Sequence, residues 1–483
     1  MKVLKDLNPQ SVFKYFEEIS QIPRGSGNEK GISDYLVKFA KELNLEVIQD
    51  EALNVIIRKP ATPGYEKAPG VIIQGHMDMV CEKNKDTIHD FEKDPIKLRV
   101  DGDYIYATGT TLGADNGIAV AYGMAILAAN DIKHPAIELL VTTDEEVGMG
   151  GTIALDGSLL KGKYLLNIDS EEEGKLLVSC AGGARNELII PVKFEEMGSD
   201  YEAYEIVLRG LKGGHSGMEI DKQRGNSNKL MGRILDEVNA NCDIRLISIN
   251  GGSKVNAIPR ECDALLAIRK NDVKKLEELV EKWDGILKDE YHANDNGVNV
   301  KVVKNEEVHK VCSKEETFKT IKAINLMPNG VDSYSVEMKG LVQSSTNLGV
   351  IHTEDDKIVL AGSTRSSVET LKTKILTQIA DIAEVLGLEF EIHAPYPAWQ
   401  YNPESKIREL CSEVYENMTG KKPEIIAIHA GLECGLLGEK VEGLDMISFG
   451  PNMYDVHTPN EHVSISSVKH IWDFLIEILK EIK

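Results

Sequence analysis

Residues 71–78, with the sequence VIIQGHMD, decide the class of fold. The short run VIIQ ends at Gly75 and is typical of a strand that is buried in a parallel sheet. Similar runs follow at residues 136–142 (AIELLVT) and 164–168 (YLLNI), and residues 116–130 are apolar nearly all round, as in a buried helix. Strands that alternate with helices predict an α/β domain with a mostly parallel central sheet.

The pattern of elements changes at about residue 186 and returns at about residue 399. Between these points, alternating strands are followed by amphipathic helices, which is typical of an α+β domain. Residues 264–269 and 358–365 both predict strands that end in arginine and precede a helix, so we expect a duplicated ferredoxin-like sandwich here. The sequence therefore predicts a discontinuous domain at residues 1–185 and 399–483, with a second domain at residues 186–398 inserted into it.

The composition excludes several classes of protein. The chain has 483 residues, with 55 Lys and Arg against 78 Asp and Glu, and a formal net charge of −23. This acidity argues against nucleic acid and anionic membranes as partners, because both bind clusters of basic residues. The hydrophobic share of 42% is too high for a disordered chain. We expect a cytoplasmic protein, because the sequence has no signal peptide, no apolar run long enough to span a bilayer, and only seven scattered cysteines without a CxxC pair.

Histidines and carboxylates follow the predicted strands of the first domain. The residues concerned are His76, Asp78, Asp115, Glu145, Glu146, Asp169 and His457. Taken singly, each is explained as well by a turn or by a solvated surface. In a parallel sheet, however, the carboxyl ends of the strands meet at one edge, and so many carboxylates together are costly to desolvate without a counter-charge. We therefore predict one or two divalent cations at this edge. Imidazole and carboxylate ligands without thiolate favour zinc, with manganese or cobalt as alternatives.

Five motifs occur in an order that resembles a known family. GHMDMV, LGADNG, DEEVG, NID and VHTPNE are similar to motifs of the co-catalytic zinc metallopeptidases, which include aminoacylases, carboxypeptidase G, carnosinases and peptidases T and V. PRGSGNE, GGHSGMEID and HAGLECG extend the resemblance over the whole chain, and they are most similar to the aminoacyl-histidine dipeptidase branch. The resemblance implies a phosphorylase/hydrolase-like catalytic domain that binds two divalent cations per chain, together with an inserted lid domain.

The resemblance also implies a ligand set. His76 and Asp169 would bind the first cation, and Glu146 and His457 would bind the second. Asp115 would bridge both cations.

Two further residues of the first domain have implied roles in catalysis. Asp78 would orient the imidazole of His76. Glu145 would act as the general base that activates a metal-bridging water, and it would then donate a proton to the leaving amine. Because neighbouring residues at the end of a strand point in different directions, Glu145 can stay free while Glu146 binds metal.

The lid would contribute the groups that bind substrate. By resemblance, His215 in GGHSG polarises the scissile carbonyl, Asn256 in VNAIP helps to hold the substrate, and Arg365 in STRSS binds the substrate carboxylate. Gly431 in HAGLECG would offer backbone contacts, with His429 as a weaker candidate. In dimeric relatives the carbonyl-binding histidine comes from the partner's lid. A duplicated lid would supply it within one chain, so we expect either a monomer or a homodimer.

Together these features predict a metal-dependent dipeptidase whose small peptide substrates include Xaa-His dipeptides. The same motifs would suit a tripeptide aminopeptidase or an N-acyl amino-acid deacylase, and lid geometry would decide between them. A non-catalytic peptide-binding protein on the same fold is a further alternative, but such a protein would usually lack a ligand or the base. A serine or cysteine nucleophile is disfavoured, because no GxSxG elbow occurs and the cysteines lie in no motif.

Overall fold

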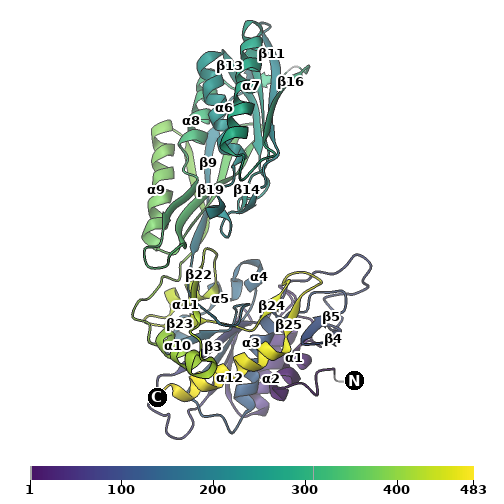
Figure 1. The fold of residues 1–483 in the computed structure, drawn as a ribbon, viewed down its shortest axis with the longest axis vertical. Helices are drawn as coiled ribbons and strands as arrows, with labels where there is room; N and C mark the ends of the chain where they lie inside the picture. The colour runs from purple at the N-terminus through teal and green to yellow at the C-terminus, as the bar shows by residue number, and fades with distance from the viewer. Residues whose placement is uncertain (1–2, 308) are drawn as a thin grey trace. The chain divides into compact units, whose positions relative to one another are not determined.

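The computed structural model describes residues 3–307 and 309–483. The chain forms two compact units, which we describe separately (Figure 1). The first contains the chain up to Ser179 together with Tyr401–Ala427 and Leu432–Lys483, and the second contains Cys180–Gln400 and Ile428–Gly431. The catalytic role predicted for residues 1–185 and 399–483, and the lid role predicted for residues 186–398, stay predictions at this point.

A mixed eight-stranded sheet forms the centre of the first unit, in the order β1-β2-β6-β3-β7-β23-β8-β22. Its four middle strands, β6, β3, β7 and β23, run parallel, and antiparallel pairs flank them on both sides. The α/β class and the parallel central strands are therefore confirmed. The strands are β1 (Glu46–Gln49), β2 (Val55–Lys59), β3 (Val71–His76), β6 (Ile137–Thr142), β7 (Tyr164–Asn167), β8 (Lys175–Cys180), β22 (Glu424–Ile428) and β23 (Asp445–Ser448).

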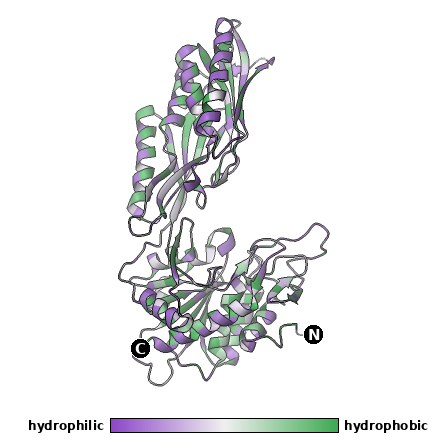
Figure 2. Cartoon of the chain, viewed as in Figure 1, coloured by the Kyte–Doolittle hydropathy of each residue, from purple (hydrophilic) through white to green (hydrophobic). Residues whose placement is uncertain are grey.

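Burial follows the apolar pattern of the sequence. Every residue of β3 and β6 is buried, and so is nearly every residue of α3 (Ala114–Ala128), which contacts β3. Apart from one short helix at Glu145–Gly148, which has no buried residue, the other helices have one buried and one exposed face, and Figure 2 shows this as mixed colouring along them. They are α1 (Gln10–Ile19), α2 (Lys30–Glu42), α4 (Glu145–Gly148), α5 (Gly150–Ala154), α10 (Lys406–Thr419), α11 (Glu433–Lys440) and α12 (Ile465–Glu481).

A small antiparallel sheet in the same unit connects the two halves of its sequence. Its strand order is β24-β25-β5-β4, so strands from the C-terminal segment pair with strands from the N-terminal segment. The loop between β24 and β25 carries His457. The four strands are β4 (Leu98–Asp101), β5 (Tyr104–Ala107), β24 (Met453–Tyr454) and β25 (His462–Ser464).

The second unit is built on a nine-stranded antiparallel sheet. Eight of its strands follow the order β16-β11-β15-β13-β19-β20-β9-β21, and β18 pairs with β19. The strands are β9 (Gly182–Pro191), β11 (Tyr201–Arg209), β13 (Ile244–Gly251), β15 (Cys262–Arg269), β16 (Asn299–Asn305), β18 (Gly330–Tyr334), β19 (Val342–Thr353), β20 (Lys357–Ser366) and β21 (Glu389–Tyr396). Two short pairs lie outside this sheet, β10 (Glu195–Glu196) with β17 (Lys310–Val311) and β12 (Gly214–His215) with β14 (Ala257–Ile258).

The chain order in this unit repeats a βαββαβ pattern, which is that of a ferredoxin-like sandwich. The elements β11-α6-β13-β15-α7-β16 form one copy, and β9-α8-β19-β20-α9-β21 form the other, in which the first copy is inserted after β9. The two predicted strand-then-helix segments fall at equivalent places, on β15 with α7 and on β20 with α9. The topology therefore matches the predicted duplication. The helices are α6 (Ser227–Asn241), α7 (Val273–Glu290), α8 (Lys314–Leu326) and α9 (Glu369–Leu386).

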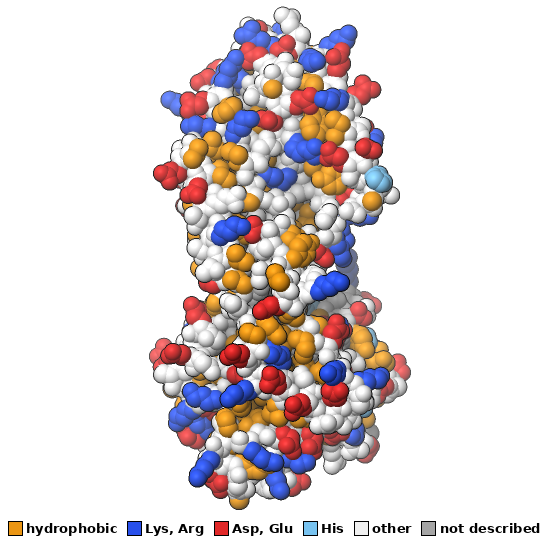
Figure 3. Space-filling view, turned by 60° about the vertical axis from the view of Figure 1, so that its left-hand side comes forward, with side chains coloured by type: hydrophobic (Ala, Val, Ile, Leu, Met, Phe, Trp, Pro, Cys, Tyr) orange, Lys and Arg blue, Asp and Glu red, His pale blue; other side chains and the backbone are white. Residues whose placement is uncertain are grey.

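The surface is charged with both signs. Acidic and basic side chains are interspersed over the visible face of each unit (Figure 3). Among the described residues, no helix combines the length and the apolar character that a bilayer span requires. The acidic side chains on the visible surface are exposed to solvent. The carboxylates that follow the central strands are described below as a candidate site.

Candidate metal centre

Two groups of candidate metal ligands lie at the carboxyl edge of the first unit's sheet. His76, Asp115 and Asp169 form one group, and Asp115, Glu146 and His457 form the other, with the ligand atoms of each group within 4.8 Å of one another. Asp115 belongs to both groups. Its Oδ1 lies 3.2 Å from His76 Nε2, and its Oδ2 lies 3.1 Å from His457 Nε2, so each of its oxygens faces one group. The structure thus brings together the five residues that were predicted as ligands.

The ends of strands and the start of a helix position the first group. His76 is the last residue of β3, and Asp169 lies two residues beyond the end of β7. Asp115 lies at the start of α3 in a non-helical conformation, and its peptide bond to Asn116 is cis. Asn116 donates from Nδ2 to the carbonyl of Ile168 (2.6 Å) and accepts at Oδ1 from the backbone N–H of His76 (3.3 Å). It therefore ties the start of α3 to both strand ends.

Glu145 and Glu146 begin a helix instead of ending a strand. β6 ends at Thr142, and α4 starts at Glu145. The predicted reason for their different orientations is therefore wrong, because successive residues of a helix are separated by about 100° of rotation and do not alternate across a sheet. Glu146 belongs to the second ligand group, whereas Glu145 belongs to neither group. The Oε2 atom of Glu145 lies 4.0 Å from His76 Nε2.

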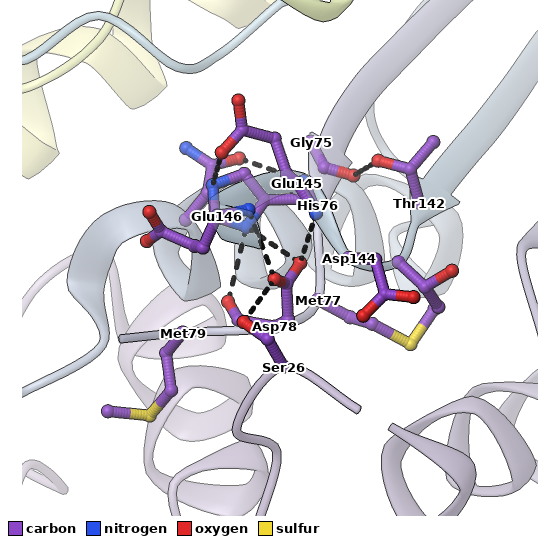
Figure 4. A network of polar contacts seen from close by, with 12 residues as sticks. Ser26, Gly75, His76, Met77, Asp78, Met79, Thr142, Asp144, Glu145 and Glu146 are labelled. Atoms are coloured by element: carbon purple, nitrogen blue, oxygen red, sulfur yellow. Dashed lines mark hydrogen bonds and ion pairs between the residues drawn. The ribbon is translucent and has the colours of Figure 1, made fainter. Parts of the chain in front are cut away.

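Asp78 connects His76 to the start of α4, as Figure 4 shows. Its side chain is fully buried, and its Oδ1 lies 3.3 Å from His76 Nδ1. It also accepts hydrogen bonds from Ser26 Oγ (2.8 Å) and from the backbone N–H groups of Glu145 (3.1 Å) and Glu146 (3.3 Å). Asp78 is therefore placed to fix the ring of His76 and the two glutamates together.

The protein alone does not balance the charge of this cluster. Burial lowers the pKa of His76, but contacts with three carboxylates outweigh burial and raise that pKa well above its usual value. The two carboxylates beside His457 raise its pKa to about 10. Burial, reinforced by nearby carboxylates, raises the pKa of Asp169 to about 7 and that of Glu145 to about 9. Without another cation, the imidazoles therefore retain protons and some of the carboxylates are protonated.

A divalent cation in each group would remove this imbalance. The donor set consists of imidazole nitrogens and carboxylate oxygens, which suits zinc, manganese or cobalt. Glu146 Oε1 is buried and has no hydrogen-bond partner among the described residues. Buried oxygens without a protein partner are rare in folded proteins, and many of them bind an ion or an ordered water. The residues present therefore fit a pair of cations that share Asp115.

Comparison with known proteins shows the family to which the chain belongs. The family model described as peptidase family M20/M25/M40 matches residues 72–481. The chain belongs to this family. It is 40% identical over 484 residues to the cytosol non-specific dipeptidase of Escherichia coli (strain K12), covering 100% of this chain and 99% of the relative. The family resemblance is thereby confirmed.

Solved structures extend the comparison to the fold. The crystal structure of aminoacylhistidine dipeptidase from Vibrio alginolyticus has a TM-score of 0.94 to this chain at 39% identity, covering 99% of this chain and 98% of that one. Aminopeptidase PepT from Bacillus cereus has a TM-score of 0.58 at 16% identity, covering 99% of both chains, and shares the fold. The predicted fold class is therefore confirmed over the full length of the chain.

Three buried charged residues near the ligands of this M20-family chain were not predicted. The first is Arg24 of the PRGSGNE motif, which is only 2% exposed. It donates to the carbonyls of Met77 (3.0 Å), Asp78 (3.3 Å) and Gly113. A Cβ at Gly113 or at Gly117 would lie 2.5 or 2.6 Å from Arg24 Nη2, so the glycines of LGADNG make room for the guanidinium. Arg24 thus joins the loop after β3 to the turn before Asp115.

The second is Glu461 of the VHTPNEHV motif, which is also only 2% exposed. Its two oxygens accept the backbone N–H groups of Leu112 (2.7 Å), Gly113 (3.0 Å), Ala114 (2.8 Å) and Asp115 (3.4 Å). One carboxylate therefore holds the whole turn that presents the shared ligand.

The third is Glu433 of the HAGLECG motif, which lies beneath the strand ends. It accepts hydrogen bonds from Gln74 Nε2 (2.6 Å), Thr142 Oγ1 (2.9 Å) and Thr152 Oγ1. Gln74 Oε1 in turn accepts from Asn167 Nδ2 (2.6 Å). This buried network links β6, β3 and β7 close to the points where the candidate ligands leave them. A charged residue inside a motif was the available signal for all three, but its burial could not be seen in the sequence.

Replacing Arg24 by methionine is expected to destabilise the first unit strongly. Methionine removes the hydrogen bonds to three buried carbonyls, of which that of Gly113 keeps a second donor in the N–H of Gly117. It also removes the charge that opposes Glu461, and the free energy of unfolding should fall by about 3–5 kcal/mol. Arg99→Met is the matched control, because the side chain of Arg99 is 48% exposed and makes a long ion pair with Asp101 and a cation–π contact with Tyr106. Such exposed contacts are weak, so their loss should cost no more than about 1 kcal/mol. Urea unfolding of both variants measures this. Equal midpoints would show that Arg24 contributes no such stability.

Two of the predicted substrate-binding residues are neighbours in the second unit. His215 pairs with Ala257 between β12 and β14, and its Nδ1 accepts the backbone N–H groups of Gly217 (3.2 Å) and Met218 (3.0 Å). Asn256 is exposed beside this pair. The ring of His215 therefore carries its proton on Nε2, which is the tautomer that can donate to an external oxygen.

The remaining candidates form a second set within the same unit. Arg365, near the end of β20, donates from Nη1 to the hydroxyl of Tyr396 (2.9 Å). A Cβ at Gly431 would lie 2.8 Å from the ring of the same tyrosine. His429 is buried, with its Nε2 2.6 Å from Ser345 Oγ. The sequence did not single out Tyr396, although it contacts two of the predicted residues.

Proposed function

We propose that the chain is a metal-dependent dipeptidase that hydrolyses Xaa-His and related dipeptides. The observation that carries the proposal is the pair of ligand groups that share Asp115, with the carboxylate of Glu145 beside them in neither group. The names of two similar proteins, cytosol non-specific dipeptidase and aminoacylhistidine dipeptidase, support the choice of dipeptides as substrates. The first name also supports a cytosolic location.

We propose that the two groups hold two divalent cations, of which zinc suits the ligands best. His76 and Asp169 would hold one, Glu146 and His457 the other, and Asp115 both. Bound cations would polarise the peptide carbonyl and lower the pKa of a nearby water. Side chains of this chain would transfer the protons and bind the substrate.

Glu145 is the proposed general base. It takes a proton from the attacking water and passes it to the nitrogen of the leaving amine, so that one carboxylate serves both halves of the reaction. Its side chain is 18% exposed, and this leaves access to a substrate while limiting competition from bulk water. Asp78 acts through other residues, since it fixes the ring of His76 and the backbone N–H groups at the start of α4.

The second unit is proposed as the lid that recognises the dipeptide. His215 would donate a hydrogen bond from its Nε2–H to the oxygen of the scissile carbonyl as negative charge develops there. Asn256 and the backbone at Gly431 would hold the peptide, and Arg365 would bind its terminal carboxylate. His215 and Asn256 belong to the first copy of the sandwich and Arg365 to the second. One chain therefore contains the full set, and a monomer or a homodimer would serve equally.

Hydrolysis of a panel of substrates, before and after removal of metal, tests the function. We expect rapid turnover of Xaa-His dipeptides, and a rate lower by at least about 100-fold after chelation and dialysis, which added zinc restores. Tripeptides should lose their N-terminal residue only slowly, because a carboxylate clamp at a fixed distance from the scissile bond selects dipeptide length. Full activity without metal would contradict the metal proposal. A preference for tripeptides or acylated amino acids would reassign the substrate.

A further inference from the structure

Four residues form a row across the end of the second unit's sheet. Ser345 on β19 lies opposite Arg365 on β20, Arg365 lies opposite Gly183 on β9, and Gly183 lies opposite Tyr396 on β21. Because glycine has no side chain, Tyr396 reaches across Gly183, and its hydroxyl accepts a hydrogen bond from Arg365 Nη1 (2.9 Å). A Cβ at position 183 would lie 2.5 Å from that hydroxyl oxygen. The contact between the arginine and the tyrosine therefore depends on a glycine in the strand between them.

The tyrosine is held on other sides as well. Its ring lies against Gly431, where a Cβ would come within 2.8 Å. Lys372 Nζ donates to its backbone carbonyl (2.8 Å). A side chain confined in this way gives the guanidinium of Arg365 a fixed anchor, and a fixed donor loses less conformational freedom when it binds a ligand.

The charge of Arg365 is not balanced by the protein. Among the described residues it makes no ion pair with a carboxylate, and its buried Nε has no hydrogen-bond partner. Two histidines lie near it, and burial, followed by the positive charge of Arg365, lowers the pKa of His215 and lowers that of His429 to about 4. The carboxylate near His215, that of Glu219, forms ion pairs with Lys222 and Arg224 instead. Burial raises the pKa of Tyr396, so the phenol keeps its hydrogen. A half-buried cation beside neutral groups that can donate is a site for an anion.

We propose that Tyr396 positions Arg365 and, together with it, binds the carboxylate at the C-terminus of the dipeptide. The hydroxyl accepts from the arginine, and its own hydrogen has no acceptor among the described residues, so it remains available to the ligand. The guanidinium and the phenol then present neighbouring donors to the two oxygens of one carboxylate. This inference rests on the proposed function, because it takes the anion to be the end of the substrate.

Kinetics of Tyr396→Phe on matched substrates test the proposal. The pair is an Xaa-His dipeptide and the same dipeptide with its carboxylate converted to an amide. We expect wild type to prefer the acid, and Tyr396→Phe to raise KM for the acid by about 10- to 100-fold with kcat changed only a few-fold, because one hydrogen bond to a charged group is lost. The kcat/KM for the amide should stay within about twofold of wild type, because the amide never used that bond.

Two further variants sharpen the test. Gly183→Ala places a methyl group 2.5 Å from the hydroxyl oxygen and so displaces the tyrosine. It should therefore reproduce the effect of Tyr396→Phe. Tyr334→Phe is the matched control, since Tyr334 is 47% exposed on β18 of the same sheet and should have no effect on either substrate. An equal loss on acid and amide in Tyr396→Phe would mean a merely structural role and would overturn the proposal. So would a wild type that does not distinguish the two substrates.

A binding measurement separates this inference from the proposed function. Calorimetry in a Glu145→Ala background follows acid and amide without turnover. We expect Tyr396→Phe to weaken binding of the acid by at least about tenfold and to leave the amide unchanged. If wild type hydrolyses no dipeptide but this difference in binding is found, the function is wrong and the carboxylate site stands. If inorganic phosphate competes as well as the dipeptide does, the site is a general anion site and the assignment to the substrate terminus is overturned.

Discussion

Replacing Glu145 by alanine is expected to lower kcat by at least about a thousandfold while the protein keeps its fold and its bound metal. The reason lies in the geometry: the carboxylate is beside both ligand groups and a member of neither. Removing it leaves the ligands His76, Asp115 and Asp169 in place but takes away the group that accepts and returns the proton. Glu145→Gln, which keeps the shape and loses the basicity, should be impaired to a similar degree.

Asp144→Asn is the matched control for this variant. Asp144 precedes Glu145 and belongs to neither ligand group, and among the described residues its side chain accepts one hydrogen bond, from the backbone N–H of Gly27 (3.2 Å). It has a positive φ of 54°, which asparagine adopts readily. We therefore expect activity within a few-fold of wild type. Metal analysis and steady-state kinetics of the three variants decide the matter. Loss of metal from Glu145→Ala would make Glu145 a ligand, and wild-type turnover would exclude it as the base.

The convergence of the candidate metal ligands could be predicted from the sequence because it follows from one regularity. Polar residues that come directly after buried parallel strands meet at one edge of the sheet. His76 and Asp169 illustrate this, since each lies at or just beyond a strand end and they share a ligand group. Glu146 also lies at this edge of the sheet, as expected, but the local structure differs from the prediction. It belongs to the helix α4 and not to the end of a strand. The buried strands therefore predicted where the side chains meet. The chain after β6 determined their local conformation, and the strand pattern did not predict it.

The residues that support the site could not be predicted in this way. Arg24 and Glu461 are charged residues in loops, which usually lie in solvent, and only the folded chain shows that four N–H groups of one turn converge on the carboxylate. Tyr396 shows a second kind of limit. Its contact with Arg365 requires the register of three neighbouring strands, with glycine in the middle one. Such a contact depends on pairings between distant segments, which a local pattern does not contain.

Replacing Asp115 by alanine is expected to have the largest effect on metal content, because this residue alone belongs to both ligand groups. Its two oxygens face different histidines, at 3.2 Å and 3.1 Å. If Asp115 bridges two cations as proposed, alanine removes one ligand from each of them and also the negative charge that lies between them. We expect Asp115→Ala to retain less than about one cation in ten after dialysis, since losing a charged ligand at each site weakens both together.

The metal content of Asp115→Ala is compared with that of variants of residues that belong to one ligand group only. Asp169→Ala should lose the cation of the first group only, and Glu146→Ala that of the second only, so each should retain about one cation per chain. Asp101→Ala, which removes a carboxylate that is 78% exposed and belongs to neither group, should retain two. Elemental analysis of the dialysed proteins measures the stoichiometry without reference to activity. Two cations in Asp115→Ala would refute the bridging role, and one cation would assign Asp115 to a single group. A stoichiometry of none, one, one and two across the four variants requires a shared carboxylate, because two independent sites cannot both depend on one residue.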